Sequence, residues 1–114
     1  MAFIRDTRTT ERPPLDESDL LVRLATHGNR DAIAAVFTSL GGVMEEEARA
    51  ALGPSREHRA ASVVRGFLER LLRGEVGCFE GGCGYGIPFL RRAVRAHVRW
   101  SRGRRSRTHA APVQ

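Results

Sequence analysis

The chain contains no lysine and no acidic residue after position 80. Aromatic residues make up only 6% of its 114 positions. No apolar run approaches the ~18 residues needed to cross a bilayer, and residues 1–12 lack the apolar stretch of a signal peptide. These absences exclude a membrane-spanning segment and predict a cytoplasmic protein with no membrane partner.

The residue sets that carry catalysis are missing as well. There is no carboxylate pair, Ser/His/Asp set or Walker loop, and the glycine-rich stretch fits neither phosphate-binding fingerprint. The histidines are not spaced like zinc-finger ligands around the two cysteines, Cys78 and Cys83. We therefore expect no enzyme, no metal and no cofactor. The cysteines are expected to be ordinary loop thiols, with a metal-dependent switch through them as the least favoured alternative.

The positive charge that is present is all arginine and is unevenly distributed. Residues 1–80 contain 11 arginines and 13 acidic residues, a net charge of −2, whereas residues 81–114 contain eight arginines and no acid, a net of +8. An uncompensated arginine block favours nucleic acid as the partner over an acidic protein surface or a tail with no specific partner. A GC-rich genome explains arginine in place of lysine most simply, although the guanidinium group also suits bidentate phosphate binding.

Apolar residues recur at three- and four-residue steps, which predicts an all-α fold: a compact bundle of about four helices. We expect a flexible lead-in over residues 1–15, a single domain over residues 16–105 and a disordered tail over residues 106–114. The first helix starts behind acidic and capping residues at 16–19, which suit its positive dipole end, and Gly28 stops it.

Two further helices follow. Asn29 can cap the second, and Gly41-Gly42 in its middle predict either a kink or two abutting helices. The acidic residues 45–47 are expected to form a solvated face. Ser55 is a candidate cap for the third helix, whose wide apolar stripe ends at Gly74 and should form the centre of the core.

Six glycines crowd residues 74–86, a density that predicts a long loop because no packed element tolerates it. The loop carries two aromatic residues, Phe79 and Tyr85. They could anchor the loop to the core, which is the commoner use, or stack on unpaired bases.

Pro88 suits the first turn of a fourth helix with one apolar and one basic face. His97 lies on the mostly apolar face and is interpreted as structural. Trp100 lies at the boundary between the faces, where its ring could stack on a base. The predicted DNA-binding residues are Arg91, Arg92, Arg95, Arg99, Trp100, Arg102, Arg104 and Arg105.

The order of these segments resembles region 2 of bacterial RNA polymerase sigma factors of the extracytoplasmic-function type. Residues 19–37 (DLLVRLATHGNRDAIAAVF) resemble the opening of that region, which typically reads DLLRRLAAGDEDAFAALY. Residues 60–73 (AASVVRGFLERLLR) fall where the family reads AEDLVQEVFLRLWR, and residues 88–96 (PFLRRAVRA) resemble FRAWLYRIARN. The resemblance covers roughly residues 18–107.

The resemblance implies a transcriptional regulator with a sigma region 2-like fold. Its third helix would dock onto RNA polymerase, and its loop and fourth helix would read a promoter −10-like element and capture a flipped base. A second domain with a helix-turn-helix is not expected. The docking residues implied are Ser62, Arg65, Gly66 and Glu69.

The first three of these docking residues depart from the family pattern, which supports an alternative. Ser62 stands where the family has Asp, and Arg65-Gly66 where it has Gln-Glu. Reversed charge at a docking surface can cost several kcal/mol through like-charge contacts. The alternative is a degenerate sigma-like interaction module that binds a regulatory protein or a polymerase subunit without binding DNA.

Overall fold

The computed structural model describes the backbone of residues 16–110 and the side chains of residues 16–102. Within this range the chain is helical, without strands, which confirms the all-α prediction. The lead-in expected over residues 1–15 lies outside the described residues. The elements in chain order are α2 (Glu17–Thr26), α3 (Arg30–Leu52), the 3-10 helix η1 (Glu57–Arg59), α4 (Ala60–Leu72) and α5 (Gly86–Ala110).

The ends of α2 and the start of α3 agree with the sequence. Asp16 caps α2 by accepting a first-turn backbone N–H at 2.8 Å, and Asn29 caps α3 in the same way at 2.9 Å. Gly28 follows α2 with φ +87°. This left-handed conformation lets the Asn29 N–H reach back to the Leu24 carbonyl at 3.1 Å, and glycine adopts it without a Cβ penalty.

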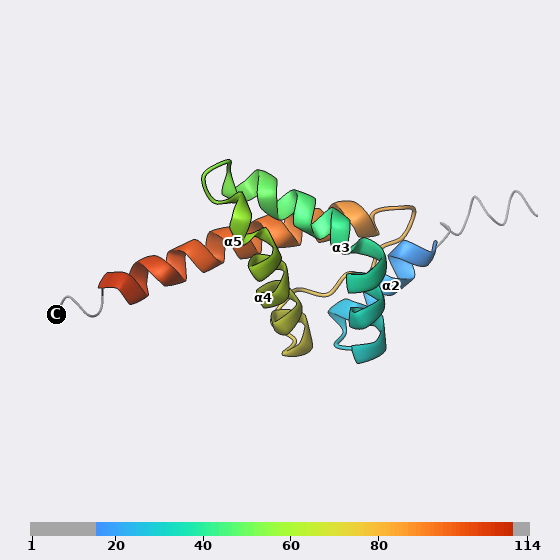
Figure 1. Cartoon of the computed structure of the whole chain (residues 1–114). Helices are drawn as coiled ribbons and strands as arrows, with labels where there is room; N and C mark the ends of the chain where they lie inside the picture. The colour runs from blue at the N-terminus through green and yellow to red at the C-terminus, as the bar shows by residue number, and fades with distance from the viewer. Residues whose placement is uncertain (1–15, 111–114) are drawn as a thin grey trace, which may run out of the picture.

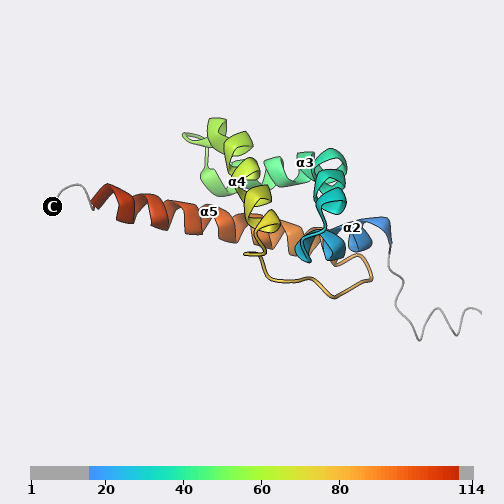
Figure 2. The same cartoon turned by 90° about the horizontal axis from the view of Figure 1, so that it is seen from below.

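The glycine pair in α3 lies in a continuous helix that bends. α3 runs unbroken over Arg30–Leu52, yet its two halves point in different directions in both views (Figures 1 and 2). Glycine pairs are among the few recognised causes of sharp helix kinks. Of the two predictions for Gly41-Gly42, the kink is confirmed.

The start of α4 differs from the prediction. Ser55 caps no helix: η1 precedes α4, and the N-cap position of α4 is Arg59, without a side-chain hydrogen bond. The reason is the turn after α3, in which the Arg56 N–H bonds to the Gly53 carbonyl at 3.1 Å. Ser55 lies inside this turn and therefore cannot cap α4. The chain instead enters α4 through a tighter 3-10 turn.

The core lies where α2, α4 and α5 pack on the bent α3. Its largest fully buried side chains are Phe67, Met44, Leu71, Leu90, Val22, Val36, Val94 and Val98. Three of them belong to α5, so the first half of that helix is fixed by its apolar face. The second half projects from the bundle, as both cartoon views show (Figures 1 and 2).

Pro88 lies in the first turn of α5, as predicted, but the helix takes in Gly86, which was assigned to the loop, and it extends further at its C-terminal end. The helix begins at Gly86, before Pro88, and continues through Gly103 to Ala110. Residues 106–110, which were predicted to be part of a disordered tail, are therefore helical, and residues 111–114 lie outside the described range. A Cβ at Gly86 would stand 2.8 Å from Asp19 Oδ1 and 3.0 Å from Asp19 Cα, so the start of α5 requires glycine.

The glycine-rich loop is docked against α2 rather than free. Buried Asp19 accepts the backbone N–H groups of Gly84 and Gly86, each at 2.8 Å. Burial alone would raise the pKa of Asp19, but these hydrogen bonds and those at Asp16 outweigh it and lower the pKa below its usual value. The carboxylate therefore stays charged and ties both the end of the loop and the start of α5 to α2.

The aromatic residues of the loop take different positions. Phe79 is buried, and its ring packs 5.1 Å from that of Phe89 in α5. Its N–H also donates to Thr26 Oγ1 at 2.9 Å. Phe79 is thus an anchor, whereas Tyr85 is 64% exposed and its predicted role in base stacking stays a prediction.

Candidate nucleic-acid interface

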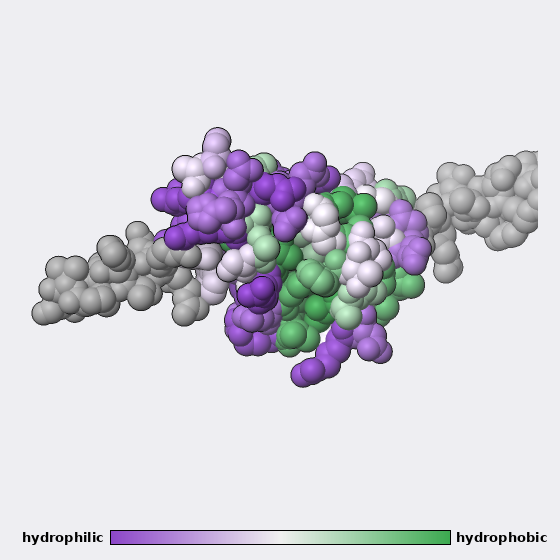
Figure 3. All heavy atoms as spheres, viewed as in Figure 1, coloured by the Kyte–Doolittle hydropathy of each residue, from purple (hydrophilic) through white to green (hydrophobic). Residues whose placement is uncertain are grey.

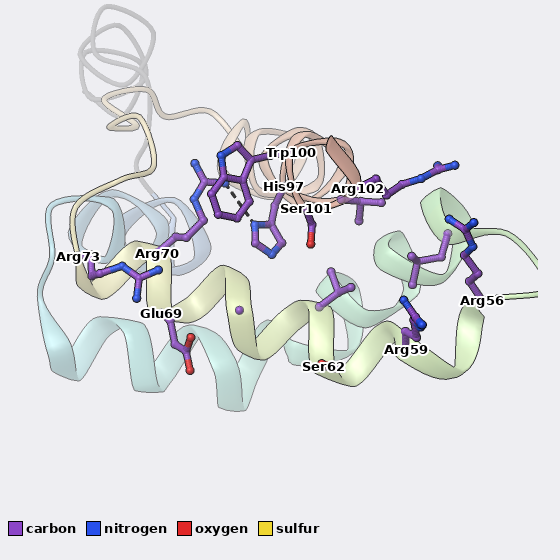
Figure 4. A pocket seen from close by; sticks show the side chains of 14 residues that line it. Arg56, Arg59, Ser62, Glu69, Arg70, Arg73, His97, Trp100, Ser101 and Arg102 are labelled. Atoms are coloured by element: carbon purple, nitrogen blue, oxygen red, sulfur yellow. Dashed lines mark hydrogen bonds between the residues drawn. The ribbon is translucent and has the colours of Figure 1, made fainter. Parts of the chain in front are cut away.

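A groove of about 460 Å³ opens between α4, the end of α3 and the part of α5 that leaves the bundle (Figure 4). Its lining contains a single acidic residue, Glu69, and we call it the arginine groove. The arginines that line it are Arg56, Arg59, Arg70, Arg73 and Arg102. Such an excess of guanidinium groups around a concave surface favours an anionic ligand.

The two ends of the arginine groove differ in charge. At one end Glu75 lies 3.6 Å from Arg70 Nε and 3.0 Å from Arg73 Nε, so these two arginines are partly neutralised. At the other end lie Arg56 and Arg59 (Figure 4). Within residues 16–102, neither of them nor Arg102 forms an ion pair. The positive potential of the groove is therefore concentrated at this second end.

His97 and Trp100 form the wall of the groove on α5. The Trp100 ring stacks on the His97 ring at 5.5 Å, and the Arg70 guanidinium carbon lies 4.4 Å from the Trp100 ring centre. Arg70 Nη1 lies 3.2 Å from His97 Nδ1. Because a guanidinium group only donates, we infer that Nδ1 accepts and that the ring proton sits on Nε2.

His97 is neutral in this setting. Its burial and the nearby Arg70 charge lower its pKa from 6.5 to about 4. This agrees with the prediction that His97 is a structural residue. It also leaves a neutral ring, with its Nε2 facing Gly66, in the wall of the arginine groove.

The four predicted docking residues of α4 separate into two groups. Ser62, Gly66 and Glu69 line the arginine groove, whereas Arg65 lines a different groove. Gly66 serves helix packing, because a Cβ there would lie 3.2 Å from His97 Nε2. The structure thus brings part of the predicted docking set together with Trp100 and Arg102 of the predicted DNA-binding set.

Two arginines of α5 are engaged inside the molecule. Arg95 Nε lies 2.9 Å from one Glu47 carboxylate oxygen, and Arg91 Nη1 lies 3.1 Å from the other. Arg91 also lies 3.5 Å from Glu46. The acidic run of α3 was predicted to be a solvated face, but the Glu47 side chain is only 12% exposed and binds α5. The periodicity could not show this, because the pairing depends on how α3 bends toward α5.

The remaining predicted arginines of α5 divide by position. Arg92 and Arg99 are exposed, and neither forms an ion pair within residues 16–102. The side chains of Arg104 and Arg105 lie outside the described residues, although their backbone belongs to α5. Among residues 16–102, the α5 arginines without an ion pair are therefore Arg92 and Arg99, which are exposed, and Arg102 at the groove, whereas Arg91 and Arg95 are partly exposed but paired.

The groove arginines that precede α5 were not among the predicted DNA-binding residues. Arg59, Ser62, Gly66, Arg70 and Arg73 recur at three- and four-residue steps, which places them on one helix face. This polar stripe was the available signal. It is hard to recognise because residues 1–80 mix both charge signs, and the approach of α5 is needed to turn the stripe into a groove.

A second groove, of about 370 Å³, lies between α3 and α4 and is mainly apolar. It is lined by Phe37, Gly41, Glu45, Ala61, Val64, Arg65 and Leu68. Figure 3 shows apolar surface gathered between these two helices, with hydrophilic surface over the connection from α3 to α4. Phe37 is 56% exposed, an unusual position for a large aromatic side chain.

Comparison with protein-family models, curated proteins and solved structures found no match to this chain. Over residues 16–110, none of the helices combines the length and the apolar character needed to span a membrane.

Proposed function

We propose that the chain is a DNA-binding transcriptional regulator that resembles region 2 of sigma factors and binds DNA phosphates with the arginine groove and the exposed arginines of α5. The observation that carries the proposal is the arginine-rich end of the groove, where Arg56, Arg59 and Arg102 lie together and form no ion pair within residues 16–102. We assign no catalytic role to the chain.

The proposal shifts the centre of the interface from the whole of α5 to its junction with η1 and α4. Arg91 and Arg95 are held by Glu47, so a phosphate would have to compete with a carboxylate for them. Within residues 16–102, no carboxylate forms an ion pair with Arg92, Arg99 or Arg102, so a phosphate could bind them without displacing one. Arginine suits this role because its planar fork binds phosphate oxygens in pairs.

Fluorescence anisotropy with labelled duplex and bubble DNA tests the proposal. The groove variant replaces Arg56, Arg59 and Arg102 by Gln, and the control variant replaces Arg30, Arg49 and Arg65 by Gln. Both remove three charges, but the control residues do not line the arginine groove. We expect the groove variant to bind at least tenfold more weakly than the control. Equal losses in the two variants would refute the groove as the interface.

The same assay tests base stacking separately. Tyr85 is largely exposed, and Trp100 is 37% exposed with its ring against His97 and Arg70. If these rings stack on unpaired bases, wild type prefers bubble over duplex DNA and Tyr85→Ala reduces that preference. Equal binding of wild type to both DNA forms would remove stacking from the proposal and leave phosphate binding.

A second candidate function, docking onto a regulatory protein or an RNA polymerase subunit, rests on the apolar groove between α3 and α4. Its exposed Phe37 and the neighbouring Leu68 offer the apolar contact that protein interfaces use at their centre. Phe37→Asp should abolish capture of RNA polymerase core while leaving DNA affinity unchanged. Undiminished capture by this variant would exclude the groove as the docking site.

A further inference from the structure

Three metal-ligating side chains meet at the end of α2, away from the arginine groove. His27 follows the last residue of α2, and Cys78 and Glu80 belong to the glycine-rich loop. One ligand atom from each lies within 4.8 Å of the other two. His27 Nε2 is 2.7 Å from a Glu80 carboxylate oxygen, and His27 Nδ1 is 3.8 Å from the Cys78 sulfur.

The loop is held in a position that keeps these three side chains together. Phe79, between the two loop ligands, is buried, and its N–H binds Thr26 Oγ1. Arg23 Nη2 donates to the Glu80 carbonyl at 2.8 Å, which fixes the loop on its other side. With Phe79 turned inward, Cys78 and Glu80 are left exposed on the surface near His27. The cluster therefore follows from the docking of the loop.

From this geometry we propose a zinc site formed by His27, Cys78 and Glu80. Thiolate, imidazole and carboxylate are the three donor types that Zn²⁺ takes in proteins. Bond lengths of about 2.0–2.3 Å in a tetrahedron place ligand atoms roughly 3.3–3.7 Å apart. A metal would take one nitrogen of His27, and with one ligand atom from each residue the three atoms lie within 4.8 Å of one another. The exposed side chains would have to move together to bring all three separations into this range. Three protein ligands leave the fourth position to water.

The site would give the loop a metal-dependent attachment to α2. A loop with many glycines loses much conformational entropy when it is ordered, and a metal bridging two elements favours the docked form. The pairing of His27 with Cys78 is invisible in the sequence because more than 50 residues separate them. The proposal does not depend on DNA binding, since none of the three ligands lines the arginine groove.

Isothermal titration of Zn²⁺ into the reduced, untagged full chain tests this site. We expect one Zn²⁺ per chain, and a loss of affinity of at least tenfold in Cys78→Ser and in His27→Gln. Glu80→Gln should weaken binding less, because one oxygen can still coordinate. Cys83→Ser is the matched control and should bind like wild type, because Cys83 is not in the cluster.

Thermal unfolding gives a second readout with the same variants. Zn²⁺ should raise the Tm of wild type and of Cys83→Ser but not of Cys78→Ser. Circular dichroism without metal verifies that each variant is folded, which is expected because all the substituted residues are exposed. The proposal is overturned if wild type binds no Zn²⁺, if Cys83→Ser loses as much affinity as Cys78→Ser, or if all variants bind like wild type.

Discussion

At the scale of single residues, one buried carboxylate determines how the glycine-rich loop joins the bundle. Asp19 accepts two backbone hydrogen bonds from the loop, and it lies so close to Gly86 that a Cβ on that residue would clash with it. Asp19→Asn keeps the shape but removes the charge and turns one acceptor into a donor. We expect a loss of about 3 kcal/mol in unfolding free energy, measured by urea denaturation. Asp31→Asn, at an exposed site in the first turn of α3, should cost less than about 0.5 kcal/mol.

His97 makes stability depend on pH between about 4 and 6.5. Its pKa is about 4 in the folded chain and 6.5 when unperturbed, so between these values the unfolded state binds a proton that the folded state does not. The contribution of neutral His97 to the free energy of unfolding is therefore fully present above pH 6.5, and it is lost as the pH is lowered toward 4. We expect a loss of about 2 kcal/mol between pH 7.5 and pH 5 in urea denaturation. A drop of the same size in His97→Gln would assign the effect to other groups.

At the scale of elements, two helix glycines have opposite roles. Gly42 in α3 is exposed, and a Cβ there meets nothing within 4 Å. Gly42→Ala should stabilise the chain by about 0.5–1 kcal/mol through helix propensity. Gly66→Ala gains the same propensity but pushes against His97, which Arg70 and Trp100 hold in place. We expect Gly66→Ala to be net destabilising, and a gain in Tm equal to that of Gly42→Ala would contradict the close packing of α4 on α5.

The ion pairs between α3 and α5 also act at this scale. Glu47→Gln would free Arg95 for phosphate and leave Arg91 paired only with Glu46, at a stability cost of about 1 kcal/mol. We expect DNA affinity at low salt to rise about threefold or more. Glu17→Gln changes the net charge equally at an exposed site in the first turn of α2, away from the arginine groove and from both arginines, and it should raise affinity less. Equal gains in the two variants would show that only net charge matters.

The elements were largely predictable because their signals are local. The caps Asp16 and Asn29 and the stop at Gly28 depend only on neighbouring residues and appear as expected. The start of α4 was not predictable, because Ser55 lies within the turn that follows Gly53 and so cannot cap the helix. The end of α5 was also missed, because Gly103 lowers helix propensity without ending a helix that continues on either side of it.

At the scale of the whole molecule, the site depends on tertiary contacts that no local signal contains. The basic character of residues 81–114 was evident from charge alone. Which arginines are accessible was not, because the bend of α3 brings Glu47 to Arg91 and Arg95. The approach of α5 to α4 likewise assembles arginines from three separate segments into one groove. The arginines of α5 were therefore visible in the sequence, whereas the arginines that precede α5 join the candidate interface only through the fold.

The salt dependence of DNA binding tests the central claim most directly. Each phosphate contact contributes a slope of about −0.9 to a plot of log K against log salt concentration for duplex DNA. Replacing Arg56, Arg59 and Arg102 by Gln should make the slope shallower by about 2 to 3. The control that replaces Arg30, Arg49 and Arg65 should keep the wild-type slope. A wild-type slope near zero, or an unchanged slope in the groove variant, would contradict DNA binding through the arginine groove.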